Sequence, residues 1–144
     1  MSRLIIVSNR LPVTIDKSHG ELHYHPSAGG LATGLNSLDE SWNKIWIGWP
    51  GQDITSDWER EAVRRDLSED SLVPVFLSQE SIELYYEGFS NKTIWPHFHY
   101  FNQYTAYNDL YWEAYQEVNQ RFADVVNPII QEDDLVWVHD YQLM

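Results

Sequence analysis

A chain of 144 residues has room for one domain with a hydrophobic core but is short for an enzyme that holds two polar substrates between lobes. It carries 22 Asp and Glu against 9 Lys and Arg, a formal net charge of -13, which disfavours nucleic acids and anionic membranes as partners. Cysteine is absent, which excludes disulfides, and no apolar run approaches the ~20 residues of a membrane span, so we expect a cytoplasmic protein.

The first part of the chain predicts a strand, a hairpin and a helix. Arg3 to Val7 is a continuous apolar run, which is typical of a strand buried on both faces of a parallel sheet. Residues 12–16 and 21–25 alternate loosely around turn-forming residues, which favours a surface hairpin. The glycine-rich segment 27–30 then leads into leucines at helical spacing, which indicates a loop that opens a helix.

Two more strands and two more helices are predicted in the middle of the chain. Residues 44–48 and 72–77 are short apolar runs of the kind found in buried strands. Residues 56–67 open with a serine followed three places later by a glutamate, which is the form of a capping box, and they predict a charged helix. Ser78 is a suitable N-cap for a helix over 79–89.

The last part of the chain holds the clearest amphipathic pattern. From Tyr107 to about Asn127, apolar residues recur in steps of three and four and predict a long helix. Residues 135–138 are another short apolar run, which predicts a further buried strand. Alternating strands and helices predict an α/β fold, a Rossmann-like, mostly parallel sheet with helices on both faces. Because the chain stops after a strand without a covering helix, we expect it to be an incomplete domain.

Three candidate site residues follow predicted strands. Ligands of open parallel sheets bind at the carboxyl ends of the strands, and Arg10, Trp49 and Asp140 occupy such positions. Taken alone, each is more often a polar or packing residue at a strand end. Gly29 and Gly30, at a predicted helix start, would let backbone N–H groups approach an anion such as a diphosphate, although most Gly-Gly pairs simply make a bend.

Metal binding is disfavoured by the same sequence. The pairs His23/His25 and His97/His99 invite a zinc interpretation, because this spacing puts both imidazoles on one side of an extended chain. Neither pair has a third ligand at a recognisable spacing, so we expect packing or hydrogen bonding, with no metal and no cofactor. The acidic run 132–134 is typical of a solvated turn and not of the paired carboxylates of a glycosidase.

Six blocks of sequence stand in a distinctive order. They are Arg3–Pro12, Ser27–Leu31, Trp46–Gly51, Tyr85–Asn91, Ile94–Tyr100 and Val136–Tyr141. In both order and spacing they resemble the trehalose-6-phosphate synthase family of retaining glycosyltransferases. The resemblance implies transfer of glucose from a nucleotide sugar, with UDP-glucose expected, to glucose 6-phosphate, in trehalose biosynthesis. It also implies two Rossmann-like domains, with residues 1–144 as the N-terminal part of the acceptor-side domain and the nucleotide-binding C-terminal domain absent.

The resemblance assigns roles on the acceptor side. Arg10 matches the arginine that grips the phosphate of glucose 6-phosphate, in keeping with the charge-assisted bonds that arginine forms. Tyr86 and Trp95 match acceptor-side aromatics, and Trp49 is a third substrate-binding candidate. Asp140 matches an aspartate that hydrogen-bonds the acceptor sugar, and it is the catalytic candidate. Without the resemblance, Tyr86 and Trp95 would be assigned to packing.

The donor side is less complete. Gly29 and Gly30 match the family's glycine pair at the nucleotide sugar, but the basic pair that holds the diphosphate belongs to the missing domain. We therefore expect the 144-residue piece to be inactive alone, and the full-length protein to be a possible homo-oligomer. Two alternatives stay open: a related transferase with another acceptor, such as a glucosylglycerol-phosphate synthase, against which Tyr86 and Trp95 argue mildly, and a non-catalytic module that binds sugar phosphates.

Overall fold

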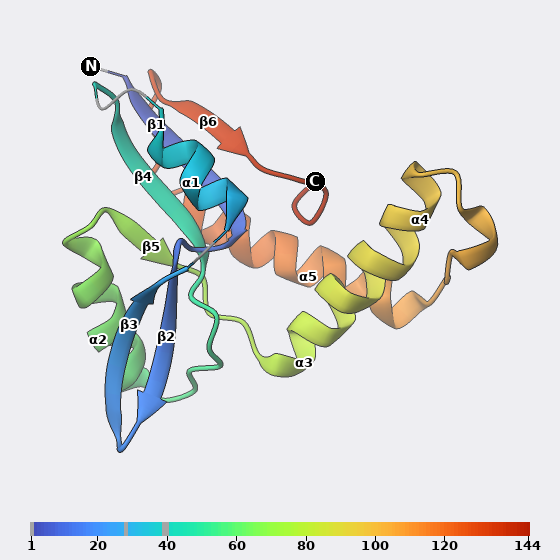
Figure 1. Cartoon of the computed structure of the whole chain (residues 1–144), viewed down its shortest axis with the longest axis horizontal. Helices are drawn as coiled ribbons and strands as arrows, with labels where there is room; N and C mark the ends of the chain where they lie inside the picture. The colour runs from blue at the N-terminus through green and yellow to red at the C-terminus, as the bar shows by residue number, and fades with distance from the viewer. Residues whose placement is uncertain (1, 28, 39–40) are drawn as a thin grey trace.

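The centre of the molecule is a four-stranded sheet with every neighbouring pair parallel (Figure 1). The computed structural model describes residues 2–27, 29–38 and 41–144, so Ala28 of the glycine-rich segment lies outside the described residues. The strand order is β5-β4-β1-β6. The strands are β1 (Arg3–Arg10), β4 (Asn43–Trp49), β5 (Leu72–Pro74) and β6 (Leu135–Val138). The predicted parallel α/β sheet is confirmed.

Both faces of β1 are covered, as its continuous apolar run predicts. Ile5 and Val7 pack into one hydrophobic cluster, and Leu4 and Ile6 pack into another on the opposite face. The exposed fraction of each of these four side chains is 4% or less. Burial of such a side chain stabilises the fold by about 1.5–3 kcal/mol, so β1 anchors the structure.

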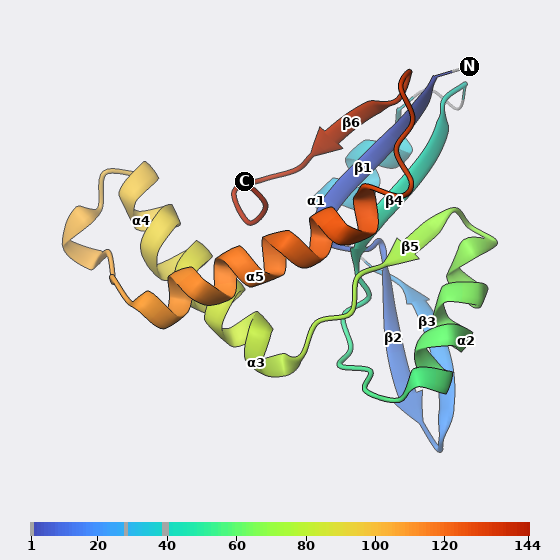
Figure 2. The same ribbon diagram turned by 180° about the vertical axis from the view of Figure 1, so that it is seen from behind.

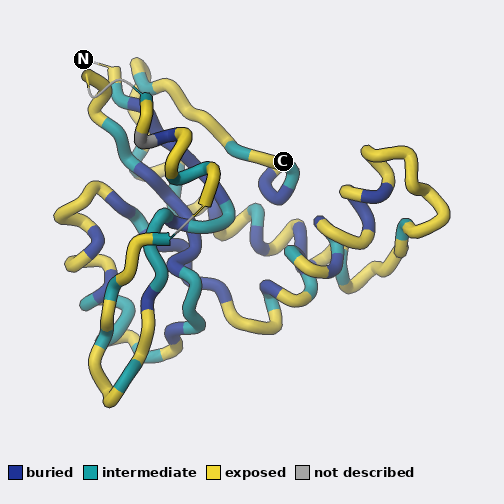
Figure 3. Tube along the Cα trace, in the orientation of Figure 1, coloured by how far each residue is buried: buried dark blue, intermediate teal, exposed yellow. Residues whose placement is uncertain are grey.

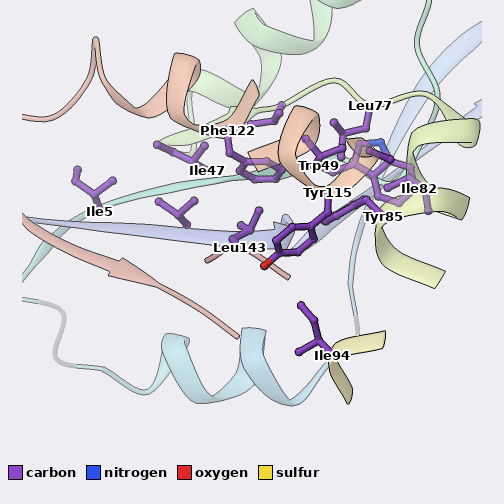
Figure 4. Packing of buried hydrophobic residues seen from close by; sticks show 14 residues of the cluster. Ile5, Ile47, Trp49, Leu77, Ile82, Tyr85, Ile94, Tyr115, Phe122 and Leu143 are labelled. Atoms are coloured by element: carbon purple, nitrogen blue, oxygen red, sulfur yellow. The ribbon is translucent and has the colours of Figure 1, made fainter. Parts of the chain in front are cut away.

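Helices cover the two faces of the sheet. Helix α1 (Gly30–Asn36) and helix α5 (Asp109–Val126) lie on opposite sides of it (Figures 1 and 2). Helix α2 (Asp57–Ser68) contributes to the same cluster as α1 through Val63 and Leu67. The predicted long amphipathic helix is α5, and its buried stripe is Ala114, Tyr115, Val118 and Phe122. Figure 4 shows Tyr115 and Phe122 within the cluster that also holds Tyr85 and Ile47.

A hairpin projects from the sheet at the end of β1. Strands β2 (Val13–Ser18) and β3 (Glu21–Pro26) pair antiparallel, as predicted. Its tip, His19 and Gly20, adopts positive φ angles of 56° and 78°. The hairpin is tied to α2 by a hydrogen bond from Tyr24 Oη to Asp66 Oδ2 at 2.7 Å and by an ion pair from Lys17 to Glu59 at 2.6 Å.

Two predictions about element ends are wrong. The predicted capping box at 56–59 does not form, because the Ser56 side chain makes no capping hydrogen bond, although Asp57 and Glu59 still place negative charge in the first turn of α2. The strand predicted over 72–77 is shorter and ends at Pro74, although Val75 N still donates to Gly48 O of β4 at 2.8 Å.

The helix predicted over 79–89 is confirmed only at its start. Ser78 caps it, its Oγ accepting a hydrogen bond from Ser81 N at 3.1 Å, but α-helical geometry ends with α3 (Gln79–Ile82). The chain then widens into the π-helix η1 (Glu83–Ile94), continues as α4 (Trp95–Phe98), and makes a short 3-10 turn, η2 (Asn102–Tyr104). π-Helical turns are rare and occur often at functional sites. None of the helices in the described ranges combines the length and the apolarity needed for a bilayer crossing.

Candidate substrate-binding site

Arg10, the last residue of β1, is held at the carboxyl edge of the sheet. Its Nη2 donates to Thr14 Oγ1 at 2.9 Å, and its Cζ lies 5.2 Å from the centroid of the Trp49 ring at the end of β4. Its Nε is buried without a hydrogen-bond partner among the described residues, and burial lowers the pKa of the guanidinium. A partly desolvated cation with an unused donor is suited to an anion, which would add charge-assisted hydrogen bonds.

A cavity of about 410 Å³ opens beside Arg10. Thr14, Ser27 and Gly29 line it together with Arg10, and the hydroxyl oxygens of Thr14 and Ser27 are 3.1 Å apart. The arginine and the first glycine of the pair therefore face one space. Gly30 lines a neighbouring cavity of about 430 Å³ between α1 and the segment that leaves β6.

Among the described residues, nothing demands glycine at either position of the pair. Gly29 has an extended φ of -160°, and a Cβ added to Gly29 or Gly30 would meet no atom within 4 Å. Helix α1 also has only seven residues. The space above the pair is open on this chain, and contact with a nucleotide sugar stays a prediction.

Tyr86, on η1, packs edge-on against Tyr85, with ring centroids 6.3 Å apart. Burial lowers the pKa of Arg10, and the charge interaction with Tyr86 only partly offsets this. Burial also raises the pKa of Tyr141, with smaller contributions from Asp140 and then Tyr86. Tyr85 is a core residue of η1, with no exposed area, and donates a hydrogen bond to Asn9 Oδ1. Because adjacent helical residues point in different directions, Tyr85 packs while Tyr86 lies half-buried at the site.

Trp95 lies at the start of α4 with 46% of its surface exposed. Its indole stacks on His99 with ring centroids 3.7 Å apart and lies 5.5 Å from the Tyr141 ring. Tyr141 Oη donates to Asn91 Oδ1 at 3.0 Å, which ties the segment after β6 to η1. A partly exposed indole beside tyrosines can cover the apolar face of a sugar.

Asp140 follows β6 in a left-handed backbone conformation, with φ of 69°. Its Oδ1 accepts a hydrogen bond from Tyr141 N at 2.8 Å, and its Oδ2 lies 4.0 Å from His139 Nε2. Its side chain is 44% exposed, so the carboxylate can accept further hydrogen bonds. An aspartate tolerates positive φ better than most residues, and such positions cluster at functional sites.

The predicted acceptor-side residues thus form a connected series around one edge of the sheet. Trp49 contacts Arg10, and Tyr141 links Trp95 to Asp140. Tyr86 packs against Tyr85, which donates a hydrogen bond to Asn9 beside Arg10. Three of the five come from strand ends, and two come from the helical segment η1–α4.

Sequence reasoning missed residues that hold the site together. Tyr141 and Asn91 lie inside blocks that carry the family resemblance, but nothing in their type or spacing predicts their hydrogen bond. Thr14 lies in a hairpin strand, where an alternating pattern indicates only which face it occupies. Within the described ranges, no group of three or more His, Cys, Asp or Glu residues is arranged to hold a metal ion, and His99 instead stacks on Trp95.

The chain matches glycosyltransferase family 20 over residues 2–144. The UDP-forming α,α-trehalose-phosphate synthase 56 kDa subunit of Saccharomyces cerevisiae is 46% identical over 144 residues, which cover 98% of this chain and 29% of that protein. Among solved structures, an α,α-trehalose-phosphate synthase from Burkholderia xenovorans in complex with glucose-6-phosphate matches 99% of this chain and 29% of its own, with a TM-score of 0.69 and 32% identity.

A second solved structure, of trehalose-6-phosphate from E. coli bound with UDP-2-fluoro glucose, is 29% identical with a TM-score of 0.68 and covers 99% of this chain. The chain spans 28% of that structure and less than a third of each of the other two relatives. Sequence and structure agree along almost the whole chain. The chain belongs to glycosyltransferase family 20.

Proposed function

We propose that this chain forms the acceptor half-site of an α,α-trehalose-phosphate synthase, which transfers glucose from a nucleotide sugar, UDP-glucose, to glucose 6-phosphate with retention. The observation that carries the proposal is the convergence of Arg10, Trp49, Tyr86, Trp95 and Asp140 at one edge of the sheet. The Burkholderia relative with glucose-6-phosphate and the E. coli relative with a fluorinated UDP-glucose support these two substrates.

Arg10 supplies local positive charge in a chain whose net charge is strongly negative. With a net charge of -13, the long-range field repels a sugar phosphate, so phosphate binding depends on local donors. Arg10 Nε has no hydrogen-bond partner in the part of the chain that the structure describes, and Arg10 Nη2 donates to Thr14. We assign the phosphate of glucose 6-phosphate to this guanidinium.

The sugar ring is assigned to the other side of the site. Tyr86 and Trp95 offer aromatic surface to its apolar face, and the Asp140 carboxylate accepts hydrogen bonds from its hydroxyls. Gly29, in the cavity beside Arg10, lies where the donor's diphosphate would adjoin the acceptor phosphate. Residues 1–144 are then the N-terminal part of the acceptor-side domain.

In the proposed reaction, the residues of this chain position the substrates and do not act as nucleophiles. In a front-face displacement the departing diphosphate accepts the proton of the acceptor hydroxyl, so no protein nucleophile forms a bond to the sugar. Holding the hydroxyl against the donor carbon makes the reaction effectively unimolecular, and Asp140 would orient the acceptor for this step. The cationic groups for the leaving diphosphate are assigned to the part of the protein beyond these residues, so the chain alone should show no turnover.

Calorimetric titration of glucose 6-phosphate at low and moderate salt tests the proposal. The unmodified chain should bind, with affinity that falls as salt rises, and Arg10→Ala should abolish binding. Arg65→Ala is the matched control, because it removes the same charge from an arginine that is 76% exposed on α2, outside the site. Equal binding by the chain and by Arg10→Ala, or no binding by the folded chain, would contradict the assignment.

A further inference from the structure

The turn after β4 leaves a gap that the Arg10 guanidinium fills. A Cβ built on Gly51 would lie 2.4 Å from Arg10 Nη2 and 2.6 Å from its Cζ, both closer than real Cβ contacts allow. Gly51 also has a φ of 83°, in the region where glycine alone is unstrained. The missing side chain at Gly51 therefore makes room for the arginine.

The turn itself has little freedom to move away. Leu11 N donates to Trp49 O at 2.9 Å, and Ile15 N donates to Pro50 O at 3.3 Å. These two backbone hydrogen bonds join the turn to the residues that directly follow Arg10 and Thr14. A side chain at Gly51 would displace the flexible end of Arg10, because the backbone around it is fixed.

Gly48, within β4, shows the contrast. A Cβ on Gly48 would lie 2.8 Å from Ser8 O and 2.9 Å from Leu11 N. Both are backbone atoms: Ser8 belongs to β1, and Leu11 directly follows it. Crowding at Gly48 would disturb the pairing of two central strands. At Gly51 the three nearest atoms all belong to the Arg10 side chain, so we expect the consequence to be local to the arginine.

We propose that Gly51 is a positioning residue that sets the place of the Arg10 guanidinium and, with it, the geometry of the acceptor-phosphate site. The inference rests on the proposed function for the ligand alone; the contact between Gly51 and Arg10 is independent of it. Thr14 holds Nη2 from one side, the Trp49 ring lies beneath Cζ, and Gly51 leaves the remaining side open. Gly51→Ala forces the guanidinium out of this position.

Gly20 provides the matched control for the backbone. It has a nearly equal φ of 78° at the hairpin tip, and a Cβ there would meet nothing within 4 Å. Gly20→Ala therefore introduces the same conformational strain without any collision. The two variants should lose similar stability, and only Gly51→Ala should move Arg10.

The experiment compares Gly51→Ala, Gly20→Ala, Arg10→Ala and the unmodified chain. The first readout needs no ligand: the Nε–Hε NMR signal of Arg10, which feels the ring current of Trp49, should shift in Gly51→Ala and stay in place in Gly20→Ala. In the second readout, titration of glucose 6-phosphate should show affinity weakened about tenfold or more by Gly51→Ala, and changed less than about twofold by Gly20→Ala.

The outcomes separate the two claims. An unshifted Arg10 signal in Gly51→Ala overturns the positioning role. A Gly51→Ala chain that unfolds while Gly20→Ala folds also overturns it, because the substitution would then disrupt the fold and not displace the arginine. Glucose 6-phosphate bound equally well by Arg10→Ala would overturn the proposed function, while the NMR signal would still decide the role of Gly51.

Discussion

Strands β1 and β6 lie side by side in parallel and carry similar apolar runs, yet their burial is opposite (Figure 3). Leu4 and Val7 of β1 are 4% and 3% exposed, whereas their partners Leu135 and Val138 are 53% and 51% exposed. β1 has a strand on each side, while β6 pairs with β1 alone in the described sheet. An apolar run thus predicts a strand, and only its neighbours decide how much stability it contributes.

The comparison extends to the site, because each strand leads into one part of it. Arg10 extends from the buried β1, and its place follows from the packed core. Asp140 follows the exposed β6, and its place depends on side-chain contacts: Tyr115 Oη donates to Tyr141 O at 3.0 Å, and Tyr141 reaches Asn91. The Arg10 part of the site should therefore be the more rigid.

The largest expected effect comes from truncating a core side chain of β1. Ile5 has no exposed surface, and Ile5→Ala should lower the free energy of unfolding by about 2–5 kcal/mol, through lost burial and the cavity left behind. Chemical denaturation measures it. Ile130→Ala is the control, because the same atoms are removed from a side chain that is 39% exposed, and a similar loss there would remove the distinction.

A polar substitution at paired positions compares the strands directly. Val7 and Val138 are opposite each other in the β1–β6 ladder. Val7→Thr buries a hydroxyl and should cost about 1–3 kcal/mol, whereas Val138→Thr should stay within about 0.5 kcal/mol. Equal melting-temperature shifts for the two variants would show that β6 is covered in solution.

Removing one hydroxyl should loosen the Asp140 part of the site. Tyr141→Phe loses the hydrogen bond to Asn91 and should cost about 0.5–1.5 kcal/mol, with a change in the NMR signal of the neighbouring Trp95 indole. Tyr104→Phe, in a residue that is 71% exposed, is the control. If the Trp95 signal does not change in Tyr141→Phe, the position of the Trp95 ring does not depend on the Tyr141 hydrogen bond.

The smallest expected effect is a change in folding stability that occurs only at acidic pH. At the start of β6, hydrogen bonding from Arg3 lowers the pKa of Asp134 to about 2. A carboxyl whose pKa is lower in the folded chain stabilises above its ordinary pKa near 3.8, and that stability is lost as pH falls toward 2. Asp134→Asn should flatten the stability profile between about pH 4 and pH 2, and Asp133→Asn, an exposed neighbour, should leave it unchanged. Identical profiles for both variants would contradict a role for the Arg3 ion pair.

Most of the fold follows from periodicity, but the π-helix does not. The cap at Ser78 predicts a helix over 79–89 without revealing its width. Gly88 of η1 approaches α5 closely, since a Cβ there would lie 2.8 Å from Tyr111 Cδ1. Such a close approach between helices is a tertiary property that local sequence does not encode.

The site divides in the same way. The rule for strand ends predicts Arg10, Trp49 and Asp140, while Tyr86 and Trp95 emerge only from the family resemblance, because an aromatic in a helix is typical of a core. Gly51 could not be predicted, since its effect depends on where the Arg10 side chain lies.

The acceptor half-site is tested most directly by the indole N–H signals of the tryptophans during NMR titration with glucose 6-phosphate. Trp49, beneath Arg10, and Trp95, beside Tyr141, should shift together along one binding curve. Trp58, which is 68% exposed on α2, should stay in place. Shifts absent from Trp49 and Trp95, or no larger there than at Trp58, would contradict an acceptor site built by this chain.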